Sequence, residues 1–360
     1  MSTATPSKRN SSFELLRILS MFFIVMSHYT TIGVQPWKQN ITSLFYSSLP
    51  IGGTLGVNCF VFITGYFLLS KDFTLEKLSR LIFQVISFSA IISIIVFFTK
   101  YGQEQYSIGA FIKASAGIMG NYWFINSYIA LLIFSPFLNS FLRKLEKKEH
   151  FYFIIVLITL NYLLPQLRIP TNMGNTCLFV TLYSIAAFFR LYQNSIHISL
   201  RSAILSFSAL LVLDILLIWS TQVYGFMAIL SPFIVGHSSI ILLLLSMSFF
   251  IIFAKIHINY SRIINYFGAS TLGIYLFHEH AFSRTLLWGK ILHCPEAPFG
   301  DTPYIHCVSA ILLVFTAGIV ADMIYRHTIS YLHTPFFNYI VSPITTTVKR
   351  FWKAVTNSAY

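Results

Sequence analysis

The chain has 360 residues, of which 56% are hydrophobic and only 10% are charged, and its formal net charge is +13. Soluble domains carry roughly 25% charged residues, so this composition excludes an ordinary soluble protein and is typical of a membrane protein. The basic residues lie in short clusters between apolar runs and form no long, aromatic-interleaved basic surface. We therefore expect no nucleic-acid partner.

The apolar runs indicate membrane-spanning helices. A bilayer core about 30 Å thick requires roughly 20 mostly apolar residues per helix. The segment VYGFMAILSPFIVG, residues 223–236, is also apolar, but Pro232 and its glycines favour a re-entrant or interfacial connection. We expect an all-α polytopic membrane protein with about ten transmembrane helices, near residues 13–33, 50–70, 79–99, 121–142, 151–166, 176–193, 202–221, 237–255, 266–288 and 304–326.

The distribution of charge predicts the orientation in the membrane. Of the 24 lysines and arginines, 17 fall on the side of the two termini, six fall on the other side and Arg17 lies within the first span. Positive charge is retained in the cytoplasm, so both termini are predicted to be cytoplasmic in a multi-pass protein of the bacterial inner or plasma membrane. Residues 1–330 form the predicted ten-helix transmembrane domain. Residues 331–360, basic and aromatic, are predicted to be a cytoplasmic interfacial tail, with a loosely ordered tail as the alternative.

The first span carries three ionisable groups in FELLRILSMFFIVMSHY. Arg17 and His28 are eleven residues apart, which returns to nearly the same helix face about 16 Å further along the axis. Glu14 lies three residues before Arg17, the spacing of an ion pair on one helix face. Snorkelling at the interface is the alternative for Glu14 and Arg17, and a structural hydrogen bond is the alternative for His28. An ionisable group at the depth of His28 is a functional-site hypothesis.

Four motifs resemble those of the acyltransferase 3 family, membrane enzymes that acylate cell-surface glycans and other extracytoplasmic acceptors. Arg17 and His28 match its arginine–x10–histidine motif. CFVFITGYFLL resembles its aromatic segment ending in Ser-Gly-Phe or Ser-Gly-Tyr, with Thr64 in place of the serine. NYWFINSYIALLIFSPFLN and GASTLGIYLFHEH are similar to its Trp-Phe…Ser-Pro-Phe-Leu-Asn and Ser-Leu-Gly-Ile-Tyr-Leu-x-His segments. The resemblance covers nearly the whole chain.

The resemblance implies a membrane-bound O-acyltransferase. Its donor would be cytoplasmic acyl-CoA, most simply acetyl-CoA, and its acceptor a hydroxyl of a lipid-linked or surface saccharide. The expected partners are acyl-CoA, this glycan and membrane lipid. A polysaccharide exporter or flippase of the same fold is the alternative, and a structural or sensory membrane protein is a third.

Acyl transfer from a coenzyme A thioester requires a base and a site for phosphates. His28 is the predicted base, because a sugar hydroxyl is a poor nucleophile at neutral pH. Arg17, Lys77 and Arg80 are the predicted cations for the donor phosphates at the cytoplasmic mouth, although Lys77 and Arg80 also fit the positive-inside rule. The family commonly has Arg-x-x-Arg where this chain has Lys77-Leu-Ser-Arg80, and lysine lacks the bidentate fork of arginine.

The other candidate residues lie in the fourth and ninth predicted spans. Possible donors to a developing oxyanion are Tyr122, Trp123, Asn126 and Tyr128. For Tyr122 and Trp123 the alternative is an interfacial aromatic belt. His278 or Glu279 is expected to orient His28 or to grip the acceptor, with structural hydrogen bonding as the alternative. The predicted catalytic residues are His28, Arg17, Glu14, His278 and Glu279, and the predicted donor-binding residues are Arg17, Lys77, Arg80, Tyr122 and Trp123.

No metal is expected from the sequence. His278 and His280 would point about 200° apart on a helix and do not form the HExxH zinc pattern. The four cysteines have no metal-binding spacing, and Cys294 and Cys307 form either a disulfide or two separate thiols. Asp214 and Asp322 are expected to make polar contacts between helices.

Overall fold

The computed structural model describes residues 9–39, 41, 43–70, 74–117, 122–171, 173–225 and 236–346. Every regular element in these ranges is a helix, and none of them is a strand. The all-α prediction is therefore confirmed. The predicted connection at 223–236 lies almost entirely outside the described residues, as does the end of the predicted tail after residue 346.

Seven helical segments are long and apolar enough to span a membrane, and each corresponds to one predicted span. The segments are Ser11–Val34 (α1, Ser11–His28, with a π-helical turn), Leu44–Leu68 (α2, Leu44–Ser48, and α3, Ile51–Leu68), Leu75–Phe97 (α4), Trp123–Leu142 (α7), Gly174–Leu191 (α10), Leu200–Tyr224 (α11) and Pro303–Thr328 (α17).

The other three predicted spans fall on shorter helices, so the total of ten stays a prediction. The span at 237–255 corresponds to α13 (Ile240–Lys255), a shorter apolar helix. The span at 151–166 comprises α8 (Lys147–Ile158), a π-helical turn and α9 (Leu164–Gln166). The span at 266–288 is divided into α14 (Arg262–Gly268), α15 (Thr271–Glu279), α16 (Ala281–Thr285) and a π-helical turn.

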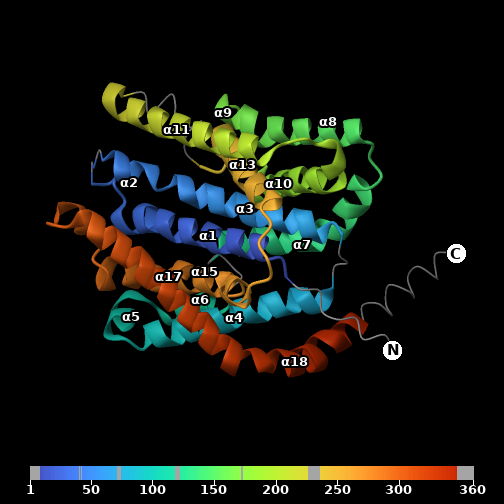
Figure 1. Ribbon diagram of the computed structural model, residues 1–360. Coiled ribbons are helices and arrows are strands. Elements are labelled where there is room, and N and C mark those ends of the chain that lie inside the picture. Colours follow the sequence, from blue (N-terminus) through green and yellow to red (C-terminus); the bar gives the residue numbers. More distant parts are fainter. Residues whose placement is uncertain are drawn as a thin grey trace.

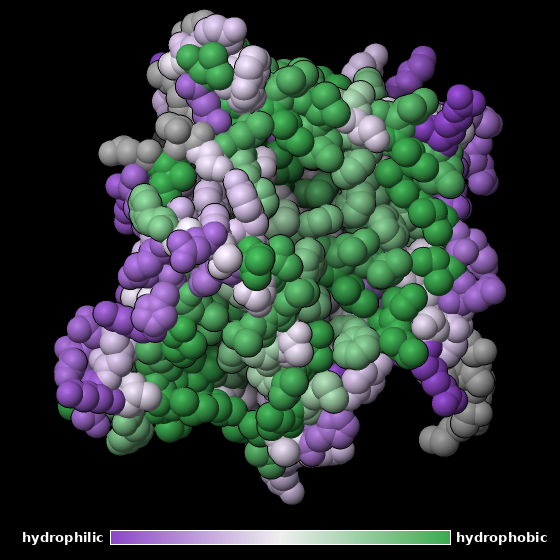
Figure 2. Space-filling model, turned by 60° about the vertical axis from the view of Figure 1, so that its left-hand side comes forward, coloured by the Kyte–Doolittle hydropathy of each residue, from purple (hydrophilic) through white to green (hydrophobic). Residues whose placement is uncertain are grey.

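The long helices run side by side, with α1 near the middle of the bundle (Figure 1). It packs against α3, α13, α14, α15 and α17. We call the end of the bundle at which α1 and α4 begin the near end, and the opposite end, toward which the π-helical turn Tyr29–Val34 extends, the far end. The face in Figure 2 shows a broad hydrophobic band with hydrophilic residues at two opposite margins, as expected for a membrane protein.

Glycines in α3 allow it to approach α1 closely. A Cβ atom on Gly53 would lie 2.5 Å from Oγ of Ser27, and one on Gly52 would lie 2.8 Å from the carbonyl oxygen of Phe23. Small residues of this kind let two membrane helices pack with their backbones nearly in contact. The half of α1 that ends at His28 is therefore held in a fixed position.

Serines anchor the near end of α1. The hydroxyl of Ser12 donates to the carbonyl of Ile256 at 2.8 Å and accepts a hydrogen bond from the backbone N–H of Ile258 at 3.0 Å. The side-chain amide of Asn265 in α14 donates to Ser11 at 3.1 Å. These bonds fix α14, and therefore the broken segment that follows it, against α1.

The chain after α17 packs along the near end of α4. It comprises a short 3-10 turn, α18 (His333–Phe336) and a π-helical turn. His333 and the hydroxyl of Ser79 lie 3.0 Å apart, and the ring of Phe83 contacts that of Phe336. Tyr339 and Ile340 are exposed. These contacts are compatible with an interfacial tail, which stays a prediction.

Candidate active site

Two helices end at the same place and create the candidate site. The α-helical part of α1 ends at His28, and a π-helical turn begins at Tyr29. α15 ends at Glu279 because the backbone of His280 leaves the helical region, with ψ at 136°. Irregular backbone inside a membrane protein is tolerated where it is buried in protein or lines a cavity, and π-helical turns are frequent at functional sites.

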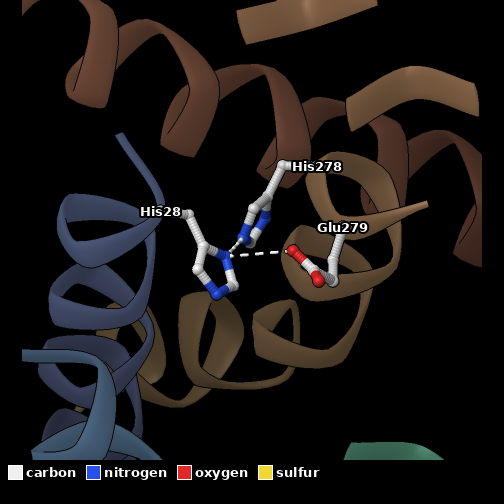
Figure 3. A group of neighbouring side chains, drawn as sticks. All are labelled: His28, His278 and Glu279. Atoms are coloured by element: carbon white, nitrogen blue, oxygen red, sulfur yellow. Dashed lines mark hydrogen bonds and ion pairs between the residues drawn. The ribbon is translucent and has the colours of Figure 1, made fainter. Parts of the chain in front are cut away.

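His28 contacts both His278 and Glu279 (Figure 3). Its Nδ1 atom lies 2.9 Å from Nε2 of His278 and 3.3 Å from Oε2 of Glu279. His278 and Glu279 are almost fully buried, and about one sixth of the His28 side chain is exposed. The sequence suggested His278 or Glu279 as the partner of His28, and the fold brings all three side chains together.

The hydrogen bonds fix which nitrogen of neutral His28 carries its hydrogen. Nδ1 of His278 lies 2.6 Å from the carbonyl oxygen of Ile274 and must donate to it, because a carbonyl only accepts. Nε2 of neutral His278 is therefore a lone-pair acceptor, and Nδ1 of His28 donates to it. The lone pair of His28 is left on Nε2, which points away from both partners in Figure 3.

Glu279 is held from its other side by Arg284. The guanidinium NH1 donates to Oε1 of Glu279 at 2.9 Å, so the two carboxylate oxygens face different partners. Arg284 is one of the six basic residues that the charge distribution assigns to the side opposite the termini, and the sequence did not connect it with Glu279. A basic residue five positions after Glu279 was the available signal, but a continuous helix would have turned it to another face.

The same three side chains also have the composition of a metal site. Their ligand atoms lie within 4.8 Å of one another, and imidazole and carboxylate groups are zinc ligands. A cation bound to Nδ1 of His28 would displace the hydrogen to Nε2 and remove the lone pair there. A bound metal and a basic Nε2 are thus mutually exclusive states of one cluster.

A cavity of about 580 Å³, which we call the near-end cavity, reaches toward this cluster from the near end. Arg9, Arg17 and Lys77 contribute its cations, and most of its other lining is apolar or aromatic. Arg17 donates to Oε1 of Glu14 at 2.9 Å, which confirms the predicted ion pair. A cationic mouth with an apolar interior suits a molecule that has a phosphate-rich head and a long, weakly polar arm.

The inner lining of the near-end cavity includes Ile24, one turn before His28 in α1. It also includes Tyr275, one turn before Glu279 in α15. Thr64 lines it as well and shares a hydrogen bond of 3.1 Å with the hydroxyl of Tyr128. The cavity therefore closes about one helical turn short of the His28 cluster.

Three predicted donor-binding residues do not line the near-end cavity. Arg80 is exposed and pairs with Glu76 at 3.1 Å, one turn earlier on α4. Tyr122 is buried and its hydroxyl donates to the carbonyl of Leu276 at 3.0 Å. Trp123 packs on the ring of His237 instead. Their predicted role in donor binding stays a prediction.

The remaining polar groups serve packing. The Asp322 carboxylate pairs with Arg326 at 2.8 Å and accepts from Gln84 of α4 at 3.1 Å, which confirms the predicted polar contact between helices. Asp214 is fully buried, but neither of its oxygens has a hydrogen-bond partner among the described residues, so its predicted contact is absent there.

His280 and two of the cysteines lie apart from the His28 cluster. His280 faces away from the cluster, and its Nε2 lies 3.2 Å from the hydroxyl of Ser93. It therefore does not join His278, as expected. Cys294 and Cys307 are both buried and have free thiols, which favours the second of the two alternatives that the sequence left open.

Comparison with known proteins adds one finding. No curated protein and no solved structure matches the chain significantly. A family model described as an acyltransferase domain, that of the acyltransferase 3 family, matches residues 10–321. This region includes the His28 cluster and every residue that lines the near-end cavity except Arg9. The chain therefore belongs to the acyltransferase 3 family.

Proposed function

We propose that the protein transfers an acyl group, most simply acetyl, from acyl-CoA to a hydroxyl of a lipid-linked or cell-surface saccharide. The observation that carries the proposal is the hydrogen-bond chain from Ile274 through His278 to His28, which leaves the lone pair on Nε2 of His28. A base with this tautomer, one turn from a cavity with a cationic mouth, is what acyl transfer to a weak nucleophile needs.

The proposed reaction begins with deprotonation of the acceptor by His28. As the acceptor oxygen attacks the thioester carbonyl carbon, its proton passes to Nε2 of His28 and the carbonyl becomes an oxyanion. Reformation of the carbonyl breaks the carbon–sulfur bond. The leaving thiolate takes the proton from Nε2, so that the products are the acylated acceptor and free coenzyme A, and His28 is neutral again.

Glu279 supports the charged intermediate state of His28. When Nε2 is protonated, the imidazolium carries a positive charge and Nδ1 still carries its hydrogen. Oε2 of Glu279, 3.3 Å from Nδ1, then lies beside that charge, and a charge-assisted interaction is stronger than a neutral one. Arg284 holds Oε1 and prevents the carboxylate from rotating away.

The near-end cavity is the proposed donor site. Its cations Arg17 and Lys77 would contact the phosphates of acyl-CoA, and the apolar passage toward Ile24 would hold the pantetheine arm. The charge distribution favours the cytoplasmic face for this end, and acyl-CoA is cytoplasmic. The thioester would then approach His28 from the near end, and the acceptor would approach it from the far end.

Mass spectrometry of surface glycans tests the proposal. Cells that lack the gene should lose an acyl ester, and complementation with the unaltered gene should restore it. Complementation with His28→Ala should not restore the ester, although the variant should reach the membrane at the normal level. A glycan that disappears from the surface altogether in the null cells would instead favour export, and an unchanged ester would refute acyl transfer.

A further inference from the structure

A second pocket opens on the far side of the His28 cluster. Its volume is about 550 Å³, and its walls come from the π-helical turn after His28 with the residues that follow it, and from α16 with the segment that follows it. We call it the far-end pocket. The residues that line it are Thr31, Ile32, Gly33, Val34, Gln35, Lys38, Gln39, Arg284, Thr285, Trp288, Gly289 and Pro295.

His28 lies between the near-end cavity and the far-end pocket. Ile24, four residues before His28, lines the cavity, and Ile32, four residues after it, lines the pocket. Arg284 connects the pocket directly to the cluster, because it lines the pocket and donates to Glu279. A molecule in the far-end pocket is therefore linked to the proposed catalytic base through two side chains, those of Arg284 and Glu279.

The far-end pocket is rich in hydrogen-bond donors and positive charge. Lys38 and Arg284 are its cations, and none of the described residues that line it is acidic. The charge of Arg284 is balanced by Glu279, whereas Lys38 makes no ion pair with any described residue. The pocket thus has one uncompensated positive charge at its rim.

Trp288 contributes an unsatisfied donor. Only 1% of this residue is exposed, and its indole N–H has no acceptor among the described residues. A buried donor without an acceptor costs free energy, and indole nitrogen can only donate. An oxygen-bearing ligand in the far-end pocket would supply the missing acceptor.

We propose that the far-end pocket binds the acceptor and that this acceptor is anionic, with a carboxylate or a phosphodiester seated near Lys38. The inference rests on the proposed function and narrows its acceptor to one chemical class. Both kinds of anion offer oxygen acceptors to Lys38 and to the Trp288 N–H. They correspond to sugar acids on the one hand and phosphate-linked polyols or sugars on the other.

Acceptor selectivity of the purified full-length protein provides the first test. The protein is placed in nanodiscs of neutral phosphatidylcholine, so that the lipid adds no charge, and is supplied with labelled acetyl-CoA. The acceptors are an oligogalacturonate, a glycerol phosphate oligomer and a neutral maltooligosaccharide. We expect transfer to one of the two anionic acceptors, and the acceptor that reacts distinguishes carboxylate from phosphodiester. Faster transfer to the neutral acceptor would overturn the inference while supporting the proposed function.

Single substitutions then locate the anion. Lys38→Gln should raise the KM for the anionic acceptor roughly 3- to 10-fold, with kcat nearly unchanged, and Lys38→Arg should retain most of the affinity. Trp288→Phe, which keeps a ring but removes the N–H, should also raise this KM. Lys290→Gln is the matched control. Lys290 is an exposed lysine on the π-helical turn that contains Trp288, but it does not line the pocket. An equal KM for Lys38→Gln and the unaltered protein would refute the assignment.

Surface glycans decide the outcome if no acceptor in this panel reacts. Fragmentation of glycans from complemented cells identifies the repeat unit that carries the ester. An ester on or next to an acidic unit supports the inference, and an ester on a polymer without acidic units refutes it. If no ester depends on the gene at all, the proposed function fails and the inference fails with it.

Discussion

The region around His28 differs sharply from α11. α11 is a single helix of 25 residues, and only 17% of its most apolar 18-residue window is buried. Around His28 the helices are short or change from α-helical to π-helical, and several polar side chains are buried next to one another. Lipid requires an uninterrupted helix, because an exposed backbone polar group cannot be satisfied there. Breaks are tolerated only where protein surrounds them, and there they bring side chains of different helices into contact.

A pair of histidines, His28 and His150, tests this difference most strongly. His28→Gln should lower kcat by about 10²- to 10⁴-fold, the usual contribution of a general base. His150 in α8 is the control, because it is also a hydrogen-bonded histidine inside the bundle. It is fully buried, and its Nε2 atom lies 3.1 Å from the carbonyl oxygen of Ser184. His150→Gln should cost some thermal stability but little activity. Steady-state acyl transfer and thermal unfolding of both variants provide the measurement, and equal losses of kcat would contradict the proposed role.

Metal ions provide the next test, because a cation and a basic Nε2 exclude each other. Treatment with EDTA should leave acyl transfer unchanged. Added Zn²⁺ should inhibit, since binding at Nδ1 of His28 would place the hydrogen on Nε2. In the His278→Gln variant, which lacks one of the three ligands, residual activity should be less sensitive to Zn²⁺. Loss of activity with EDTA and recovery with Zn²⁺ would instead make the cluster a metal centre.

Neutralising Glu279 should have a smaller effect than removing His28. Glu279→Gln keeps the shape but loses the interaction with the charged imidazolium, worth about 1.5–3 kcal/mol, or roughly a 10- to 150-fold decrease in kcat. Glu76→Gln is the control, because Glu76 pairs with the exposed Arg80 far from the cluster. A kcat for Glu279→Gln within twofold of the unaltered protein would remove Glu279 from the mechanism.

Sequence reasoning succeeded where one helix carries the whole pattern. Glu14 and Arg17 are three residues apart and pair as helical spacing requires. His28 was identified because an ionisable group is unexpected at its depth, and the motif around His278 and Glu279 suggested a partner for it. Each of these inferences needed only local spacing or a short motif.

Sequence reasoning failed where the position depends on a helix break. The end of α15 at Glu279 and the π-helical turn after His28 left no clear signal in an apolar sequence. Arg284 was therefore not connected with Glu279. Arg80 was grouped with Arg17 by its charge and by the resemblance of Lys77-Leu-Ser-Arg80 to Arg-x-x-Arg. It pairs with Glu76 at the i−4 position, and its role in donor binding stays a prediction.

The contact between α1 and α14 should be sensitive to a single methyl group. A Cβ atom on Gly268 would lie 2.5 Å from Oε2 of Glu14, so Gly268→Ala should displace Glu14 and disturb its pair with Arg17. We expect a stability loss of about 1–3 kcal/mol and a several-fold higher KM for acyl-CoA. Gly109→Ala is the control, because the nearest atom to the new methyl group is 3.9 Å away. Unfolding curves and donor titrations should separate the two variants.

Two buried aspartates provide the last comparison, between α11 and α17. Asp214 in α11 has no described hydrogen-bond partner, whereas Asp322 in α17 pairs with Arg326 and accepts from Gln84. Breaking a buried ion pair leaves an uncompensated charge and costs about 3–5 kcal/mol, so Asp322→Asn should lower the unfolding temperature. Asp214→Asn removes a carboxylate that no described residue satisfies, and we expect unchanged acyl transfer with equal or higher thermal stability. A loss of activity in Asp214→Asn would show that α11, a continuous helix, also takes part in the reaction. Retained activity would agree with a reaction that takes place in the region around His28.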